Sequence, residues 1–389
     1  MNAVKKFFNI LLILFGIVLI AICADLMTNK LTRTEFKDLD ETDRGAIEEL
    51  CEITSLFDDE YGNENIWNDS YNPRNNVSMI TRRYGMVKGS TYAVNLSVTK
   101  NMFAQRITMP EEYSDIPVYR FSYLTPFTFA LAKKEDSGFT DVEGRMVYAA
   151  CFDTQSVKYN GTDSLEESFV KNTFEREVES ADVPTIDENV HYDLDVENIA
   201  LTGLQFRILD DMLAETSEEK LKEMISEYVT VREFQEKKFP EFAHAREQRE
   251  LRDGCAQYVF YNISDLIDHD ITYFNKEKSD SITFYSAYYY LCTGRYNSDV
   301  SEFLDESGNV YSGAALCRII NDNELIRNWS SKISGDEESF SSPYSLLQGY
   351  CSKKCSKNYN EKDINDIKRT YNYDEVISMA RALMREIKE

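Results

Sequence analysis

The N-terminal segment constrains the chain first, because it is long and apolar. One asparagine interrupts the otherwise apolar or small residues 7–24. As a helix rising 1.5 Å per residue, this run would span about 27 Å, close to the thickness of a bilayer core. Lys5 and Lys6 precede the run, and this favours a cytoplasmic N-terminus. We therefore expect a transmembrane helix, with the membrane contacted through residues 7–27.

A cleaved signal peptide is the competing interpretation. The apolar centre of a signal peptide usually has roughly 7–15 residues, which is shorter than this run. Ala21-Ile-Cys23 is an imperfect cleavage signal, and Ile22 is larger than the residue that precedes a lipoprotein cysteine. We favour an uncleaved signal anchor and leave cleavage open. Either interpretation places the bulk of the chain outside the cytoplasm, and the anchor makes it a single-pass protein of the cell membrane.

The charge of the chain narrows the choice of partner. The 389 residues include 43 Lys and Arg against 68 Asp and Glu, a formal net charge of −25. Such an acidic chain repels phosphate backbones, and no basic stripe interrupts the acidity, so we expect no nucleic-acid partner. A hydrophobic content of 42% is ample for a folded core.

Hydrophobic spacing divides the chain into four parts and predicts an α+β fold. Residues 1–27 form the anchor, and residues 28–76 a helix and a linker. Alternating apolar residues predict a small antiparallel β region over residues 77–160. Apolar residues at helical spacing predict a mainly helical body over residues 161–389. Within it, Ser164 or Asp163, Asp195, Ser217 and Pro240 are expected to begin successive helices.

The cysteines and histidines do not form a familiar metal motif. The chain has eight cysteines without a Cys-x-x-Cys pair, and only three histidines. Cys351 and Cys355 are close enough in sequence to close a small disulfide loop in an oxidising space, and buried free thiols are an equal alternative. His191 and His269 lie in acidic segments, where we expect exposed side chains.

Several segments of the helical body follow one another in a characteristic order. They are Phe169-Val-Lys171-Asn172-Thr-Phe174-Glu175, Tyr228-Val-Thr-Val-Arg-Glu-Phe234, Asp253-Gly-Cys-Ala-Gln-Tyr258, Tyr311-Ser-Gly-Ala-Ala-Leu316 and Asn328-Trp329. Over roughly residues 140–350 this order resembles that of exported or membrane-bound bacterial metallopeptidases of the gluzincin type. In that family one helix carries His-Glu-x-x-His and a later helix carries Glu-Gly-x-Ala-x-Tyr. The resemblance implies a metallopeptidase-like layout of the helical body.

The resemblance also implies that the zinc chemistry has been lost. In the family, the two histidines and a later acidic residue bind Zn²⁺, and the glutamate takes a proton from the metal-bound water. Here Lys171 stands for the first histidine, Asn172 for the glutamate, Glu175 for the second histidine and Asp253 for the third ligand. A lysine ammonium repels a dication, and an amide cannot take a proton. The resemblance thus implies no catalytic residue, no bound metal and no cofactor, with an ion pair of Lys171 and Glu175 or Asp253 in place of zinc.

One other set of polar residues offers an alternative site. His244, Glu247 and Glu250 follow one another at three-residue steps on one predicted helix, next to Asp253. They could form a metal or acid/base face, and zinc is a cofactor only in this alternative. The simpler interpretation is a solvated face with salt bridges.

The anchor and the resemblance together imply a membrane-anchored pseudoenzyme outside the cytoplasm that binds a peptide or an envelope protein without catalysis. Two alternatives stay open. The first is an active hydrolase that uses the unusual polar site. The second is a structural or adhesive ectodomain unrelated to peptidases.

Overall fold

In the computed structural model the chain is divided into two units. The structure describes residues 2–31, 34–57, 66–68, 70–85, 87–101, 103–123, 125–157, 164–178, 195–267, 283–294, 303–333, 341–355 and 363–386. The first unit, here called the β-rich unit, comprises Met1–Asn65 and Asp69–Phe174. The second, the helical unit, comprises Ile66–Asn68 and Glu175–Glu389. The division falls inside helix α4, Leu165–Val178, so one continuous helix contributes to both units.

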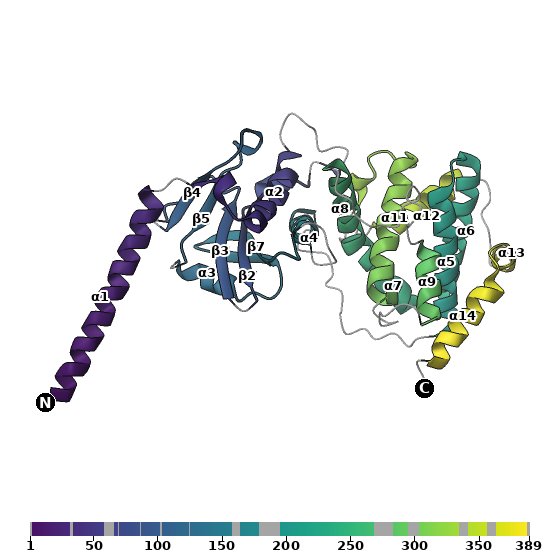
Figure 1. Ribbon diagram of the computed structural model, residues 1–389. Helices are drawn as coiled ribbons and strands as arrows, with labels where there is room; N and C mark the ends of the chain where they lie inside the picture. Colours follow the sequence, from purple (N-terminus) through teal and green to yellow (C-terminus); the bar gives the residue numbers. More distant parts are fainter. Residues whose placement is uncertain are drawn as a thin grey trace. The chain divides into compact units, whose positions relative to one another are not determined.

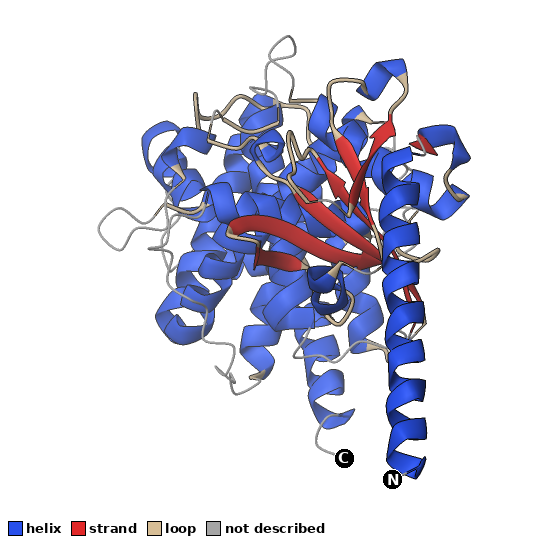
Figure 2. Cartoon of the chain, turned by 90° about the vertical axis from the view of Figure 1, so that its left-hand side faces the viewer, coloured by secondary structure: helices blue, strands red, loops and turns tan. Residues whose placement is uncertain are grey.

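The described strands of the β-rich unit form one seven-stranded sheet in the order β1-β4-β5-β3-β2-β7-β6 (Figures 1 and 2). The strands are β1 Thr34–Glu35, β2 Ser78–Tyr84, β3 Val87–Val94, β4 Ala104–Thr108, β5 Val118–Phe121, β6 Gly138–Val142 and β7 Arg145–Phe152. The α+β class is confirmed. The expected antiparallel region is a mixed sheet, however, because β2 runs parallel to β7 and β1 runs parallel to β4. Alternation of side chains shows which face is buried but does not encode strand direction.

Each face of this sheet is covered by helices of the same unit. On one face Met79, Ala93, Phe121 and Ala149 form an apolar cluster, and the ring of Phe127 from α3, Pro126–Leu131, lies 5.0 Å from that of Phe121. On the other face Tyr92 reaches α2, Glu41–Ser55, and Tyr148 reaches α4. The Tyr92 hydroxyl donates to Asp43 at 2.6 Å, and the ring of Tyr148 lies 5.2 Å from that of Phe169.

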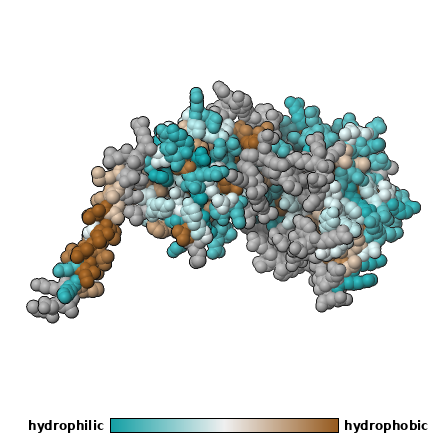
Figure 3. Space-filling model, in the orientation of Figure 1, coloured by the Kyte–Doolittle hydropathy of each residue, from teal (hydrophilic) through white to brown (hydrophobic). Residues whose placement is uncertain are grey.

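The first helix, α1, Asn2–Leu31, carries the apolar run that the sequence places in a membrane. Residues Lys6–Ala24 have a mean hydropathy of 2.9, and none of this window is buried within the protein. Figure 3 shows the apolar coat of this helix in brown. An exposed apolar segment of 19 helical residues is long enough to cross a bilayer, and a signal sequence has the same properties.

The helical unit is a bundle. Its helices are α5 Val196–Ala214, α6 Glu218–Lys238, α7 Pro240–Arg249, α8 Cys255–Leu266, α9 Phe284–Cys292, α11 Gly308–Asp322, α12 Pro343–Lys354, α13 Ile364–Thr370 and α14 Tyr373–Glu386. Helices α5, α6 and α7 begin at the starts expected from Asp195, Ser217 and Pro240. The Asp195 carboxylate accepts from the backbone N–H of Glu197 at 2.7 Å and caps α5. In α4, Ser164 Oγ accepts from the N–H of Glu167 at 3.0 Å, while Asp163 lies outside the described residues.

Helix α5 lies at the centre of the helical unit and contacts α6, α9, α11 and α14 (Figure 1). Its residues are buried on almost every side, as expected for a helix that is apolar on a broad face. The tyrosine-dense helix α9 packs closely on it at Gly203. A Cβ atom at that position would lie 2.6 Å from the ring of Tyr288, so α5 needs glycine there.

Candidate functional site

The positions that the resemblance assigns to the zinc motif begin with Lys171 and Asn172, both in the β-rich unit. The Lys171 ammonium forms an ion pair with Glu167, one helical turn earlier in α4, at 2.6 Å. The Asn172 amide donates to the Ser168 carbonyl oxygen at 2.8 Å. Lys171 therefore does not fit as a zinc ligand, because it is a cation paired within its own helix. Asn172 does not fit as a general base, because its amide cannot take a proton and bonds to the backbone.

Glu175 and Asp253 belong to the helical unit, where arginines neutralise both. Arg252 Nη2 lies 3.8 Å from Glu175 Oε1, and Arg252 Nε lies 3.1 Å from Asp253 Oδ1. Arg249 adds a second contact to Asp253 at 3.3 Å. The expected partner of these carboxylates was Lys171, and its ion pair goes to Glu167 instead. Across the described residues, no group of three or more His, Cys, Asp or Glu side chains is arranged to hold a metal ion.

The segment between α7 and α8 is a π-helical turn, Glu250–Gly254, inside one continuous helix. Its close neighbour is α11. A Cβ atom on Gly254 would lie 2.7 Å from Gly313 Cα, and one on Gly313 would lie 2.6 Å from the Glu250 carbonyl oxygen. Only two glycines allow the backbones to approach so closely. Both belong to segments that the sequence analysis singled out, and their contact fixes α11 against the turn that carries Glu250.

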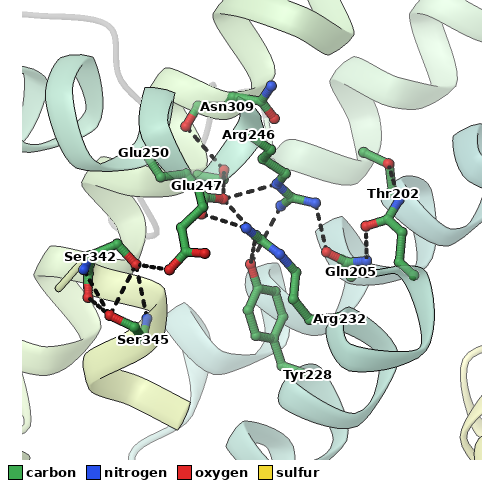
Figure 4. Close-up of polar contacts among 12 residues, drawn as sticks. Thr202, Gln205, Tyr228, Arg232, Arg246, Glu247, Glu250, Asn309, Ser342 and Ser345 are labelled. Carbon is green, nitrogen blue, oxygen red and sulfur yellow. Dashed lines mark hydrogen bonds and ion pairs between the residues drawn. The ribbon is translucent and has the colours of Figure 1, made fainter. Parts of the chain in front are cut away.

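Glu250 lies at the centre of a buried polar network in the helical unit (Figure 4). Arg232 of α6 binds its carboxylate through both terminal nitrogens, at 2.7 and 2.8 Å. Arg246 of α7 donates from Nε at 2.9 Å, and Ser312 of α11 donates at 2.8 Å. All four side chains are at most 1% exposed. The network therefore joins α6, α7 and α11 through a single carboxylate.

The network continues from Arg246 into the central helix. Arg246 Nη1 donates to Gln205 of α5 at 2.6 Å, and Gln205 donates to Gln235 of α6 at 2.8 Å. Arg232 also lies over the ring of Tyr344, with its guanidinium carbon 4.4 Å from the ring centre. Each charged group thus has several partners, which is the condition under which buried ions are tolerated.

The electrostatics of the network keep Glu250 ionised. Burial by itself raises the pKa of this carboxyl group, but Arg232 and Arg246 outweigh burial, and the pKa lies below its ordinary value. Burial and repulsion from Arg232 lower the pKa of Arg246, yet an arginine stays protonated. Two guanidinium groups therefore face the single carboxylate of Glu250.

Glu247 is the nearest further carboxyl group on α7. Burial raises its pKa, whereas a hydrogen bond from Ser342 and the attraction of Arg232 oppose that shift. Ser342 Oγ donates to Glu247 Oε1 and at the same time accepts from the backbone N–H of Ser345, which caps α12 (Figure 4). Glu247 thus connects α7 to the start of α12.

The alternative site predicted from His244, Glu247 and Glu250 is divided between different surroundings. His244 is exposed and contacts Gln248, at 3.1 Å between Nε2 atoms. Glu250 is fully buried with its arginines, and Glu247 bonds to Ser342. The simpler interpretation, a solvated face, is wrong for Arg246 and Glu250, because α6 and α11 cover them. His191 and His269 lie outside the described residues.

All eight cysteines are free thiols in the structure. Cys351 lies 3.6 Å from Ser226 Oγ, and the small loop to Cys355 is not closed by a disulfide. The buried thiols of Cys255 and Cys317 contact each other, with their sulfur atoms 3.7 Å apart.

A pocket of about 120 Å³ opens on the helical unit, and the sequence analysis did not identify it. Helix α8 contributes Tyr258, Tyr261, Asn262 and Asp265 to its wall. The facing helix α11 contributes Tyr311, Arg318 and Asp322 among others, and α5 and α9 contribute Leu213 and Phe284. On both facing helices these residues recur every three or four positions, a polar and aromatic stripe that the sequence displays.

The deep wall of the pocket adjoins an aromatic cluster that contains both tryptophans of the chain. The rings of Trp67 and Trp329 lie 5.2 Å apart, edge to face. The ring of Tyr258 lies 5.5 Å from that of Trp329 and 6.4 Å from that of Trp67. Edge-to-face pairs at these distances are favourable. Tyr258 therefore has one side in the pocket and another in the tryptophan cluster.

Comparisons of this chain with models of protein families, with curated proteins and with solved structures find no match.

Proposed function

We propose that this protein is a membrane-anchored binding protein outside the cytoplasm, and that it holds a peptide segment of an envelope partner without hydrolysing it. The absence of hydrolysis in this proposal is supported by the ion pairs of the side chains that the resemblance assigns to the zinc motif. Lys171 pairs with Glu167, while Glu175 and Asp253 are matched with Arg252. A zinc ion would have to displace these arginine contacts and approach a lysine ammonium. This disagreement with the family pattern supports loss of catalysis.

The binding part rests on the pocket between α8 and α11. Ligand sites are usually concave, with an apolar or aromatic lining and a few polar groups that fix the orientation of the ligand. This pocket combines tyrosine rings with a carboxamide, two carboxylates and a guanidinium group. The buried network around Glu250 is, in contrast, closed to a ligand, because its charged side chains are at most 1% exposed.

The location rests on α1 and on the two lysines that precede its apolar run. An exposed apolar helix preceded by Lys5 and Lys6 supports a cytoplasmic N-terminus, with both units on the other side of the membrane. Protease protection tests this proposal. In sealed, right-side-out membranes an added protease should remove a C-terminal tag and leave an N-terminal tag intact. Protection of the C-terminal tag would contradict it.

The catalytic question is tested with the full-length chain purified in detergent micelles. Zinc content by elemental analysis and cleavage of a mixed peptide library are measured on the same sample. We expect zinc well below one ion per chain and no cleavage above the buffer control. Glu175→Gln and Asp253→Asn should change neither result.

Two other results would contradict the proposal. Stoichiometric zinc that is lost in Glu175→Gln or Asp253→Asn would show a working metal site at the aligned positions. Cleavage that is lost in His244→Gln but kept in the other two variants would favour the alternative hydrolase. His244→Gln is a matched control for the aligned carboxylates, because His244 is exposed on α7.

A further inference from the structure

The pocket between α8 and α11 has an apolar floor and a charged rim. Tyr258 is 4% exposed and Phe284 is 1% exposed, and together they form the deep wall. Asp265 and Asp322 are exposed at the mouth, with Arg318 beside them. A cavity of about 150 Å³ is large enough to hold a benzene-sized group. A pocket of about 120 Å³ therefore has room for the end of one side chain.

Among the described residues that line the pocket, two are carboxylates, Asp265 and Asp322, and one is a guanidinium, Arg318. Arg318 Nε donates to Asp322 Oδ2 at 3.0 Å, so these two residues largely neutralise each other. Burial raises the pKa of Tyr258 and a hydrogen bond with Asn262 opposes that rise, while Asp322 raises and Arg318 lowers the pKa by smaller amounts. An anionic ligand would have to approach two carboxylates and one guanidinium that is already paired.

The aromatic walls add a second preference for a positive charge. Tyr258, Tyr261 and Tyr311 line the pocket, and the face of a phenol ring attracts an ammonium or guanidinium group. Asn262 lies in the same wall, and its amide nitrogen donates to the Ile66 carbonyl oxygen at 3.4 Å. The stems of lysine and arginine are apolar, so they fit beside Leu213 and Phe284 while their charged ends meet the rings.

The walls are held in place by the close contact of the two helices. Gly254 and Gly313 touch one turn before Tyr258 on α8 and beside Tyr311 on α11. Neither glycine can be enlarged without moving a backbone. The distance between the two helices is thus fixed next to the pocket, so its walls are preorganised.

We propose that this pocket receives the lysine or arginine side chain of a basic peptide. The proposal rests on the peptide-binding function proposed above and names the chemistry of the partner. The formal net charge of −25 supports it, because a basic segment would be attracted to this acidic protein before it reaches the pocket.

The two tryptophans provide a direct readout, since both lie in one cluster with Tyr258. The full-length chain in detergent micelles is titrated with acetylated, amidated pentapeptides that carry Lys, Arg, norleucine or Glu between glycines. Norleucine has the lysine stem without the amine. We expect tryptophan fluorescence to change with the Lys and Arg peptides, with affinity about tenfold above that of the norleucine peptide. The Glu peptide should not bind, and salt should weaken the binding of the cationic peptides.

Three substitutions locate the binding. Asp265→Asn and Asp322→Asn should each raise the Kd of the Lys peptide by roughly two- to fivefold, the range of an exposed ion pair. Tyr261→Leu should weaken the Lys peptide and leave the norleucine peptide unchanged. Glu324→Gln is the matched control, because it removes an exposed carboxylate two residues beyond Asp322 that does not line the pocket. These side chains are exposed or half-buried, and circular dichroism checks that each variant is folded.

The outcomes separate this proposal from the proposed function. Equal binding of the norleucine and Lys peptides, tighter binding of the Glu peptide, or unchanged affinity in all three variants would overturn the cation pocket. None of these results would affect the absence of catalysis. If the Lys peptide were bound as expected but also cleaved, the pocket would stand and the non-catalytic function would fail.

Discussion

The helical unit contains two polar clusters with opposite properties. In the network around Glu250, every charged side chain is buried and contacts partners from other helices. In the pocket between α8 and α11, the carboxylates of Asp265 and Asp322 reach solvent above tyrosine rings. A buried cluster whose charged groups all have partners fixes the packing of helices, whereas a cluster that reaches solvent has room to bind a ligand. The comparison separates polar residues that hold helices together from polar residues whose surroundings leave room for a ligand.

The same comparison explains why the two clusters should respond differently to mutation. Removing one member of a buried ion network leaves its partners charged and without compensation in a medium of low polarity. Removing a carboxylate from an exposed rim leaves a group that water can solvate. Changes at Glu250 should thus affect stability, and changes at Asp265 should affect binding.

The largest effect is expected for Glu250→Ala. The substitution leaves Arg232 and Arg246 buried without their carboxylate, which should lower the free energy of unfolding of the helical unit by about 3–5 kcal/mol. Urea unfolding followed by tryptophan fluorescence measures it, because both tryptophans belong to this unit. The triple variant Glu250→Leu, Arg232→Met, Arg246→Met should lose less stability than Glu250→Ala alone. A larger loss in the triple variant would mean that the network contributes contacts beyond charge compensation.

The second effect tests the contact that supports both clusters. Gly313→Ala places a Cβ atom 2.6 Å from the Glu250 carbonyl oxygen and should lower the free energy of unfolding by about 1–3 kcal/mol. Gly349→Ala in α12 is the matched control, because no atom lies within 4 Å of its Cβ position. It should raise stability by about 0.5–1 kcal/mol through helix propensity. Similar unfolding curves for the two variants would show that α8 and α11 can separate at low cost.

The sequence predicted the parts of this fold that depend on local chemistry. The first residues of α5 and α7 are set by Asp195 and Pro240, and these signals act within one helical turn. The parallel pairing of β2 with β7 could not be predicted, because it joins two hairpins whose order the alternation does not encode.

The sites show the same limit more clearly. Arg246 and Glu250 have the four-residue spacing of a surface ion pair, but both are buried. They are covered by residues distant in sequence: Arg232 precedes Glu250 by 18 residues, and Ser312 follows it by 62. Their surroundings are tertiary, so helical spacing alone favoured a solvated face. The pocket could have been suspected from the stripe of Tyr258, Tyr261, Asn262 and Asp265. The facing stripe on α11 had to be brought opposite by folding.

A third prediction uses pH to compare Glu250 with Glu247. The pKa of Glu250 is lowered, so its stabilising contribution is complete above its ordinary pKa and is lost as pH falls through the folded value. The pKa of Glu247 is raised, so its carboxyl group binds a proton more tightly in the folded than in the unfolded protein. Protonation of Glu247 should therefore increase the free energy of unfolding as pH falls from 7 toward about 4.3, the ordinary pKa of a glutamate.

Glu247→Gln isolates the second contribution, because Gln can still accept the hydrogen bond from Ser342. The variant should be slightly more stable than the wild type at pH 7, and the difference should shrink as pH falls. Urea unfolding of both proteins at pH 7, 6 and 5, followed by tryptophan fluorescence, measures the difference in their free energies of unfolding. The other carboxylates are the same in both proteins, so their titration cancels in this difference. A difference that stays constant with pH would show that the folded protein does not disfavour the ionised form of Glu247.

The smallest effect is expected at Lys171, the position that the resemblance assigns to the first zinc-binding histidine. Lys171 and Glu167 form a half-buried i,i+4 pair in α4, with side chains 30% and 17% exposed. A double-mutant cycle of Lys171→Gln, Glu167→Gln and both together should give a coupling energy of about 0.3–0.5 kcal/mol that falls in 1 M NaCl. Circular dichroism measures it, because the β-rich unit has neither tryptophan. A coupling of several kcal/mol that resists salt would place this pair in the class of Arg232 and Glu250, and Lys171 would then stabilise the fold.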